Sequence, residues 1–254
     1  MKAFLTAIFC LLGASVATAG DINVTADQKV EWHQKEQKIV AVGNAVATRG
    51  TDSIKADNLI AHYLGASADA KSKINRIEAN GNVKMHSAKA DAFGNTLDYD
   101  LTKDKAVLVG TPAQIKTENE TISARDNITY YPSEQKAVAT GNVEGTDKSG
   151  NKMYADDMIA YFTKESGKSS SLTLDKVNFS GNVKIVTKDA AVTADRGTYF
   201  PQSGIVKLFD NVTINQSGNI LHGDKAETNL NTGISKLLAG SKKGRVKGVF
   251  KEKK

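Results

Sequence analysis

A two-residue step, glycine followed by asparagine, recurs along the chain and constrains its fold more than any other feature. A second signature alternates with it, a small residue followed by aspartate or a polar substitute. The Gly-Asn copies, full and partial, lie at Gly43-Asn44, Gly81-Asn82, Gly110-Thr111, Gly141-Asn142, Gly181-Asn182 and Asp210-Asn211. The second signature lies at Ala26-Asp27, Ala56-Asp57, Gly94-Asn95, Ala124-Arg125, Ala155-Asp156, Ala194-Asp195 and Gly223-Asp224. Each Gly-Asn slot precedes the next small residue by 13 or 14 positions, which predicts about seven similar units.

The longer spacings repeat once along the chain. A shift of about 99 residues superimposes Ala26 on Ala124 and Ala56 on Ala155. We interpret this as a tandem duplication of residues 22–120 and 121–219, followed by a partial third copy, within one repetitive domain of residues 20–240. One of the seven units, of about 30 to 40 residues, cannot bury an apolar face alone, so successive units are expected to stack.

The segments between the signatures alternate between apolar and polar residues. After Gly81-Asn82, Val83 and Met85 alternate with Lys84 and His86. This period of two predicts half-buried strands, and the recurring glycines are expected to mark β-bulges or close backbone approaches. The same alternation is assigned to two further segments, Ile122, Ala124, Ile128 and Tyr130, and Met153, Ala155, Ile159 and Tyr161. The predicted fold is all-β, with hairpin-like units stacked side by side.

The first residues have the pattern of an export signal. Lys2 is followed by an apolar run at positions 3–12, and Ala17-Thr18-Ala19 is a small-x-small cleavage site. We predict a cleaved signal peptide at residues 1–19 and a periplasmic protein. The single cysteine, Cys10, lies inside that signal, so the exported chain has neither a disulfide nor a thiol nucleophile.

The excess of positive over negative charge comes from the C-terminus. The net charge is +6, yet residues 241–254 alone carry seven basic residues and one acidic residue. With that net +6 and the charge of Lys2 taken away, the repetitive part, residues 20–240, is left at about −1, which argues against a nucleic-acid partner. Residues 241–254 are predicted to form a basic C-terminal strand and tail.

Residues with catalytic chemistry do not form a recognisable motif. The four histidines (His33, His62, His86 and His222) lack metal-ligand spacing. No nucleophile elbow or phosphate-binding loop is present either. An aspartate that recurs once per unit is more typical of a structural device than of a catalyst. The sequence therefore predicts a protein that is not an enzyme and has no cofactor, metal site or catalytic residue.

Several motifs resemble those of the OstA-like (LptA) family of lipopolysaccharide transport proteins. They are the run from Ile22 to Asp27, the run from Leu97 to Asp104, and the closing run from Arg245 to Phe250, and they occur in family order over most of the exported chain. The resemblance implies a V-shaped β-jellyroll, open at both ends, whose apolar groove takes the acyl chains of lipid A. The expected partners are lipopolysaccharide, jellyroll domains of the inner- and outer-membrane transport components, and further copies of the chain joined head to tail by strand addition.

Ten residues are predicted to line the lipid-binding groove. The family motifs map its interior onto Ile22, Val24, Met85, Tyr99 and Leu101. Alternation alone adds Val46, Val83, Ile115, Val183 and Ile185. For each residue, ordinary core packing is an alternative to lipid contact.

Three other functions remain open from the sequence. The chain is also compatible with a structural repeat protein of the cell envelope that assembles through its edges without lipid cargo. A β-solenoid enzyme that cleaves polysaccharides would need clustered carboxylates, whereas the aspartates here are spread one per unit. A membrane-anchored sister protein of the same pathway would retain its N-terminal segment.

Overall fold

Strands account for most of the chain that the computed structural model describes, which comprises residues 22–65, 73–88, 90–164, 172–216, 218–229, 232, 234–239 and 246–249. The predicted signal peptide, its cleavage site and most of the basic tail lie outside these residues. The described ranges contain no helix of the length and apolarity needed to span a membrane. The predicted all-β class is confirmed.

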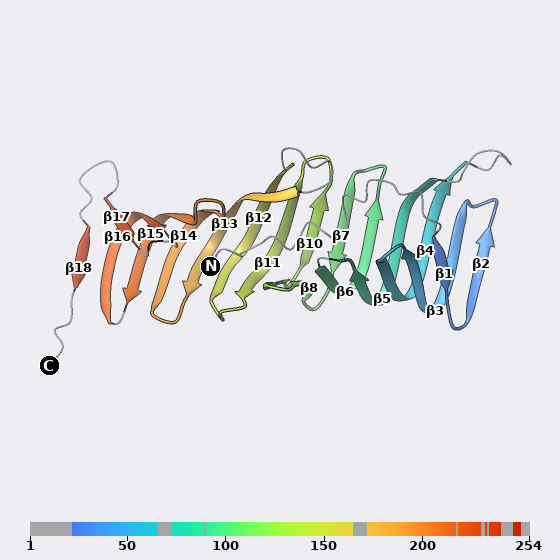
Figure 1. Ribbon diagram of the computed structural model, residues 1–254, viewed down its shortest axis with the longest axis horizontal. Coiled ribbons are helices and arrows are strands. Elements are labelled where there is room, and N and C mark those ends of the chain that lie inside the picture. Colours follow the sequence, from blue (N-terminus) through green and yellow to red (C-terminus); the bar gives the residue numbers. More distant parts are fainter. Residues whose placement is uncertain are drawn as a thin grey trace.

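The described strands form a single antiparallel sheet. Figure 1 shows them side by side along the long axis of the molecule, with β2 near one end and β18 at the other. Their bounds are β1 (Asn23–Thr25), β2 (Lys29–His33), β3 (Lys38–Arg49), β4 (Asp52–Leu64), β5 (Lys73–His86), β6 (Ala90–Asp100), β7 (Lys105–Val109), β8 (Ala113–Thr117), β9 (Glu120–Ala124), β10 (Asn127–Tyr131), β11 (Lys136–Asp147), β12 (Lys152–Lys164), β13 (Leu172–Val186), β14 (Ala190–Phe200), β15 (Ile205–Gln216), β16 (Asn219–Asn229), β17 (Ser235–Leu238) and β18 (Lys247–Val249).

Two groups of consecutive long strands, β3 to β6 and β11 to β16, are each flanked by pairs of short strands. Both β1 and β2 pair with β3, both β7 and β8 pair with β6, both β9 and β10 pair with β11, and both β17 and β18 pair with β16. Each long strand therefore contributes one half to each of two leaves. We call the leaf that contains β2, β7, β10 and β17 leaf A, and the leaf that contains β1, β8, β9 and β18 leaf B.

The Gly-Asn steps lie where a long strand passes from one leaf to the other. In β13 the pairing register with β14 shifts between Ser180 and Val183, and the intervening Gly181 and Asn182 both have positive φ, 74° and 48°. Glycine and asparagine tolerate this left-handed conformation better than other residues. Similar shifts occur at the steps in β3, β5, β11 and β15, the last of them at Asp210-Asn211. The prediction that these steps are β-bulges is confirmed.

One predicted copy behaves differently. Gly110-Thr111 lies between β7 and β8, where the chain leaves one leaf and enters the other without a continuous strand. The crossing is made here by two short strands, so a bulge is not required.

The recurring aspartates hold the bulges in place. The Asp57 carboxylate accepts hydrogen bonds from Nδ2 of Asn82 at 3.1 and 3.0 Å. The same contact recurs as Asn44 to Asp27 (2.7 Å), Asn182 to Asp156 (3.2 and 2.9 Å) and Asn211 to Asp195 (2.6 Å). The two sequence signatures are therefore the two halves of one structural clasp, repeated along the molecule.

The crossing also changes which residues of a strand face inward. In β12, Met153 and Ala155 are buried, and the next buried residues are Met158, Ala160 and Phe162. The sequence prediction that Ile159 and Tyr161 share the face of Met153 was wrong, because the irregular register at positions 155–157 shifts the alternation by one residue. The buried side chains of both leaves form one apolar cluster. The molecule is thus a β-jellyroll with its core between the leaves.

Candidate functional site

The inner face of leaf B carries an unbroken apolar row that runs the length of the molecule. Cross-strand neighbours link Val24 at one end to Gly248 at the other. The row consists of Val24, Ala47, Ile54, Met85, Ala92, Ile115, Ile122, Gly145, Met153, Ile185, Val192, Ile214, Leu221 and Gly248. No position in this row is polar, although its neighbours on the outer face are largely polar.

Leaf A supplies two comparable rows on its inner face. One consists of Val30, Ala41, Leu59, Ala79, Leu97, Leu108, Ile128, Ala139, Met158, Phe179, Gly197, Leu208, Ala226 and Leu237. The other is Trp32, Ile39, Ala61, Ile77, Tyr99, Ala106, Tyr130, Ala137, Ala160, Val177, Tyr199, Val206, Thr228 and Ser235. The second row becomes polar only at its C-terminal end, where the hydroxyls of Thr228 and Ser235 are 3.0 Å apart.

Seven of the ten predicted groove residues face this interior. Val24, Met85, Ile115 and Ile185 belong to the leaf B row, and Tyr99 belongs to leaf A. Val83 and Val183 directly follow their bulges and are 2% and 1% exposed. The structure therefore brings these side chains into one apolar cluster, and their contact with lipid remains a prediction.

The other three predicted residues do not face the interior in this way. Val46 pairs with Lys55 on the outer face, because Ala45 takes the inward position after the bulge. Leu101 lies in the turn after β6 and is 41% exposed, since the strand ends at Asp100. Ile22 precedes β1 and is 42% exposed. Val46 and Leu101 are corrections to the sequence prediction, and Ile22 lies at the open end of the molecule.

Several large interior side chains are not among the ten residues predicted from the sequence. Tyr130, Tyr199, Phe179 and Ile122 are all at most 2% exposed. Ile122 and Tyr130 had been placed on an alternating strand but not in the predicted groove. The cross-strand register needed to join them to Met85 and Tyr99 was the missing signal.

The interior tyrosines are uncharged at neutral pH. Burial raises the pKa of Tyr199 to about 12, with a smaller contribution from the negative charge of Glu120. Burial likewise raises the pKa of Tyr130 and Tyr99. In the described residues, no three histidine, cysteine or acidic side chains gather as a metal site. The three inner rows are thus uncharged and mostly apolar, which suits hydrocarbon rather than ions. The carboxylates of Glu120 and Asp147 are also buried, at 5% and 6% exposed, beside the leaf B row where β9 pairs with β11.

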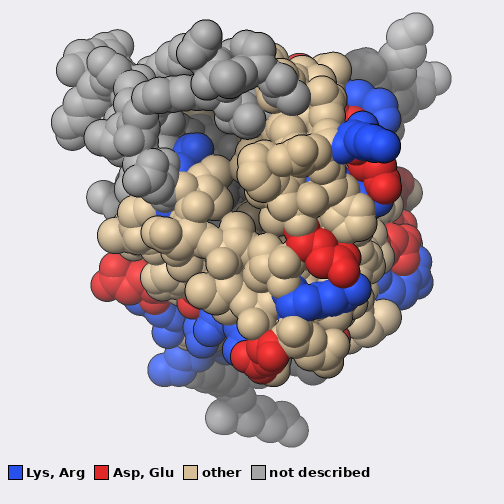
Figure 2. All heavy atoms as spheres, turned by 90° about the vertical axis from the view of Figure 1, so that its right-hand side faces the viewer, with Lys and Arg blue, Asp and Glu red and all other residues tan. Residues whose placement is uncertain are grey.

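Apolar side chains are also exposed at the two ends of the molecule. Val30 and Trp32 are 49% and 65% exposed at the N-terminal end, where the Trp32 indole donates a hydrogen bond to the Tyr63 hydroxyl at 2.6 Å. Leu238 and Val249 are 50% and 49% exposed at the other end. Figure 2 views the N-terminal end, where an uncharged area occupies the centre-left of the described face and charged side chains lie below it and along the right-hand side.

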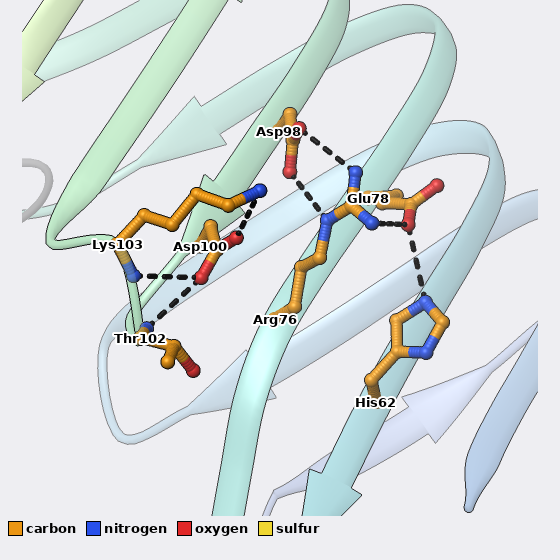
Figure 3. A network of polar contacts seen from close by, with 7 residues as sticks. All are labelled: His62, Arg76, Glu78, Asp98, Asp100, Thr102 and Lys103. Carbon is orange, nitrogen blue, oxygen red and sulfur yellow. Dashed lines mark hydrogen bonds and ion pairs between the residues drawn. The ribbon is translucent and has the colours of Figure 1, made fainter.

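The outer face carries the ion pairs. Arg76 donates two hydrogen bonds to the Asp98 carboxylate, at 2.8 and 2.9 Å, and also contacts Glu78 at 3.0 Å (Figure 3). Glu78 in turn contacts His62 at 3.1 Å. These contacts, principally the hydrogen bonds from Arg76, hold the pKa of Asp98 below its usual value. The network links neighbouring strands β4, β5 and β6 and is separate from the apolar interior.

We expect Asp98→Asn to cost at most about 1 kcal/mol at pH 7, because both partners are well exposed to solvent. A carboxylate whose folded pKa is lowered stabilises the fold above its unfolded pKa and loses that contribution as the pH falls through the folded pKa. The difference between variant and wild type should therefore shrink below about pH 4. Urea unfolding at pH 7 and pH 3 measures it. A difference that persists at pH 3 would rule out the ion pair as its source.

The chain is similar to a known protein family and to a solved structure. The family model described as LptA/(LptD N-terminal domain) LPS transport protein matches the chain twice, over residues 23–136 and 126–234. No curated protein matches the sequence significantly. Among solved structures, the chain is similar to LptH, the LptA-homologous periplasmic component of the lipopolysaccharide transport device of Pseudomonas aeruginosa, with 12% identity, 92% and 96% of the two chains covered and a TM-score of 0.24. Because the family model covers most of the sequence, the chain belongs to the LptA/LptD N-terminal domain family of lipopolysaccharide transport proteins.

Proposed function

We propose that the protein is a periplasmic, non-enzymatic carrier that shelters the acyl chains of lipopolysaccharide between leaf A and leaf B. The observation that carries this proposal is the leaf B row, which stays apolar from β1 to β18. A chain of a dozen carbons costs on the order of 10 kcal/mol to leave in water, at about 0.8 kcal/mol per CH₂. A continuous apolar row offers shelter at every position between the two ends, whereas isolated pockets would not.

The ends of the molecule support a bridging role. At the N-terminal end the described strands β1 and β2 pair only with β3, and at the C-terminal end β17 and β18 pair only with β16. Each of these short strands has one edge available for strand addition. The proposed partners are jellyroll domains of the inner- and outer-membrane components and further copies of this chain. Joining ends would extend the leaf B row from one molecule into the next.

Export to the periplasm fits the same role. The signal peptide predicted at residues 1–19 would be removed, and the exported chain would begin at Gly20. N-terminal sequencing of the protein recovered from cells tests this step, and retention of Met1 would favour the membrane-anchored sister protein instead.

Photo-crosslinking in living cells tests the carrier role directly. With a photoreactive residue at Met85 or Tyr99, we expect adducts with lipopolysaccharide, because both side chains face the interior. Matched positions on the opposite face are Lys84, next to Met85, and Asp98, next to Tyr99, and these should give no adduct. The adducts are detected as a mobility shift that reacts with antibody against lipopolysaccharide.

Two outcomes contradict the proposal. Adducts at Lys84 and Asp98 alone would place the cargo on the outer face. A purified protein whose organic extract contains no lipid A, together with no adduct at any interior position, would favour the structural repeat protein without cargo.

A further inference from the structure

A second pattern runs along the outer face of leaf A, at the ends of β7, β10 and β11 and within β12 and β13. Lysine and aromatic side chains alternate there on successive strands. The members are Lys105 on β7, Tyr131 on β10, Lys136 on β11, Tyr161 on β12 and Lys176 on β13, which we call the lysine–aromatic ladder. Tyr131 pairs with Lys136, Lys136 with Tyr161 and Tyr161 with Lys176. The alternation therefore holds in space and not only in sequence.

The ammonium groups of the ladder lie over the aromatic rings. Nζ of Lys136 and Nζ of Lys105 are 4.5 and 5.9 Å from the centroid of the Tyr131 ring. Nζ of Lys176 is 5.1 Å from the centroid of the Tyr161 ring. Cation–π contacts at this range are favourable but weak at an exposed site, so they orient the lysines without neutralising them.

The ladder differs in charge from the neighbouring part of the same leaf. Toward β2, the basic side chains have carboxylate partners: Lys38 contacts Glu36, His62 contacts Glu78 and Arg76 contacts Asp98. In the ladder Lys136 contacts Glu134, whereas Lys105 and Lys176 have ring contacts and no carboxylate partner among the described residues. The nearby Asp104 carboxylate accepts a hydrogen bond from the backbone N–H of Ser133. Asp100, the cross-strand neighbour of Lys105, contacts the Lys103 ammonium at 3.2 Å. The ammonium groups of Lys105 and Lys176 therefore stay available for an anionic ligand.

The ladder adjoins the interior wall. Lys105 begins β7, Tyr131 ends β10 and Lys136 begins β11. Their next neighbours, Ala106, Tyr130 and Ala137, pair with one another in an inner row of leaf A. A group that emerges from the interior at this margin would meet the ladder within one residue. Lysine side chains are long enough to carry their charge over such an edge.

We propose that the lysine–aromatic ladder binds the acidic saccharide of the lipopolysaccharide whose acyl chains the interior holds. This inference rests on the proposed carrier function. Because lysines lie over the ring faces, the tyrosines would contact sugar hydroxyls through their phenolic O–H groups. The lysine ammonium groups would pair with phosphate and carboxylate as point charges. Tyr131 and Tyr161 lie two strands apart, about 10 Å, which leaves room for consecutive sugar rings. The ladder thus binds the saccharide, while the interior shelters the acyl chains.

The test uses the deacylated, phosphorylated oligosaccharide of lipopolysaccharide, which has no chains to enter the interior. We expect the full-length exported protein to bind it, by calorimetry or NMR titration at low salt. The triple substitution Lys105→Gln, Lys136→Gln and Lys176→Gln should weaken binding at least about tenfold, at roughly 1 kcal/mol per lysine near an anionic group. High salt should weaken wild-type binding as well.

A matched control removes the same charge from the other leaf. Lys55, Lys84 and Lys184 lie in one outer row of leaf B, and their triple substitution by glutamine should leave binding unchanged. Equal losses in the two triple variants would overturn the proposal, because net charge alone would then explain the binding. Binding of soluble peptidoglycan fragments, with the same dependence on the ladder and no binding of the oligosaccharide, would also overturn it.

The failure of this inference is distinguishable from failure of the carrier function. Adducts at Met85 report on the acyl chains, and oligosaccharide titration reports on the ladder. If adducts form at position 85 but the triple lysine variant binds the oligosaccharide as well as the wild type does, only the role of the ladder is rejected. If no adduct forms at position 85 in the chain with an unchanged ladder, the carrier function itself is rejected.

Discussion

Substitution of Gly181 by alanine is expected to destabilise the protein by about 3 kcal/mol. Gly181 has φ of +74°, and an added Cβ would lie 2.1 Å from Oδ2 of Asp156 and 2.7 Å from its Cγ. A left-handed backbone costs an L-residue roughly 1–2 kcal/mol. Overpacking at a tight site adds about 1–3 kcal/mol. Moving Asp156 to relieve the contact would also weaken its hydrogen bonds with Asn182.

Gly150 provides the matched control. Its φ of +79° is nearly the same, but nothing lies within 4 Å of the position of an added Cβ. Gly150→Ala should therefore cost only the backbone strain, about 1 kcal/mol. Urea unfolding followed by circular dichroism gives both differences in the free energy of unfolding. If the two variants lose the same stability, the clasp between bulge and aspartate does not contribute to the fold.

The bulges are also the part of the fold that the sequence predicted best. Glycine and asparagine occupy the positions of positive φ in the steps of β3, β5, β11 and β13, and Asp210-Asn211 occupies them in β15, so these crossings have a visible signature in the sequence. The strands on either side alternate strictly enough to identify Val83, Met85, Val183 and Ile185 as inward residues. These predictions succeed because bulge chemistry and period two are local properties of the chain.

The wrong predictions, Val46 and Leu101, lie where a bulge or a turn interrupts the alternation. Valine follows asparagine directly in three full copies, but in β3 Ala45 takes that place and Val46 comes one residue later. A one-residue displacement moves a side chain to the opposite face, so Val46 faces outward. Leu101 follows Asp100, whose carboxylate accepts hydrogen bonds from the backbone N–H groups of Thr102 and Lys103 at 3.0 and 2.9 Å. That turn ends the strand before Leu101.

The continuous inner rows of leaf A and leaf B could not be predicted from the sequence for a different reason. Most strands pair with their neighbours in sequence, yet β7 pairs with β10 and β9 pairs with β11. These two pairings carry the inner rows across the middle of the molecule. They follow from the closure of two leaves around one core and have no local signature. The domain limits at residues 22–120 and 121–219 stay a prediction, as does the role of the basic tail.

Val183 faces the core and Val46 faces outward, and this difference leads to the second large expected effect. Val183→Asp should lower the free energy of unfolding by at least about 4 kcal/mol, because it places a carboxyl group at a site only 1% exposed in the apolar core. The added group has Ala194 as its cross-strand neighbour, which offers it no side-chain hydrogen bond. We expect the variant to be recovered largely unfolded or insoluble, and to give no lipopolysaccharide adduct at Met85.

Val46→Asp makes the same chemical change on the opposite face. The new carboxylate would lie directly across from Lys55, an exposed residue, and a cross-strand pair of opposite charge contributes roughly 0.2–1 kcal/mol. That gain offsets the weaker strand propensity of aspartate, so stability should stay within about 1 kcal/mol of wild type. Urea unfolding of both variants, with circular dichroism as the readout, measures the contrast. Comparable losses of unfolding free energy in the two variants would mean that Val46 faces the core, and that Ala45 does not take the inward position after the bulge.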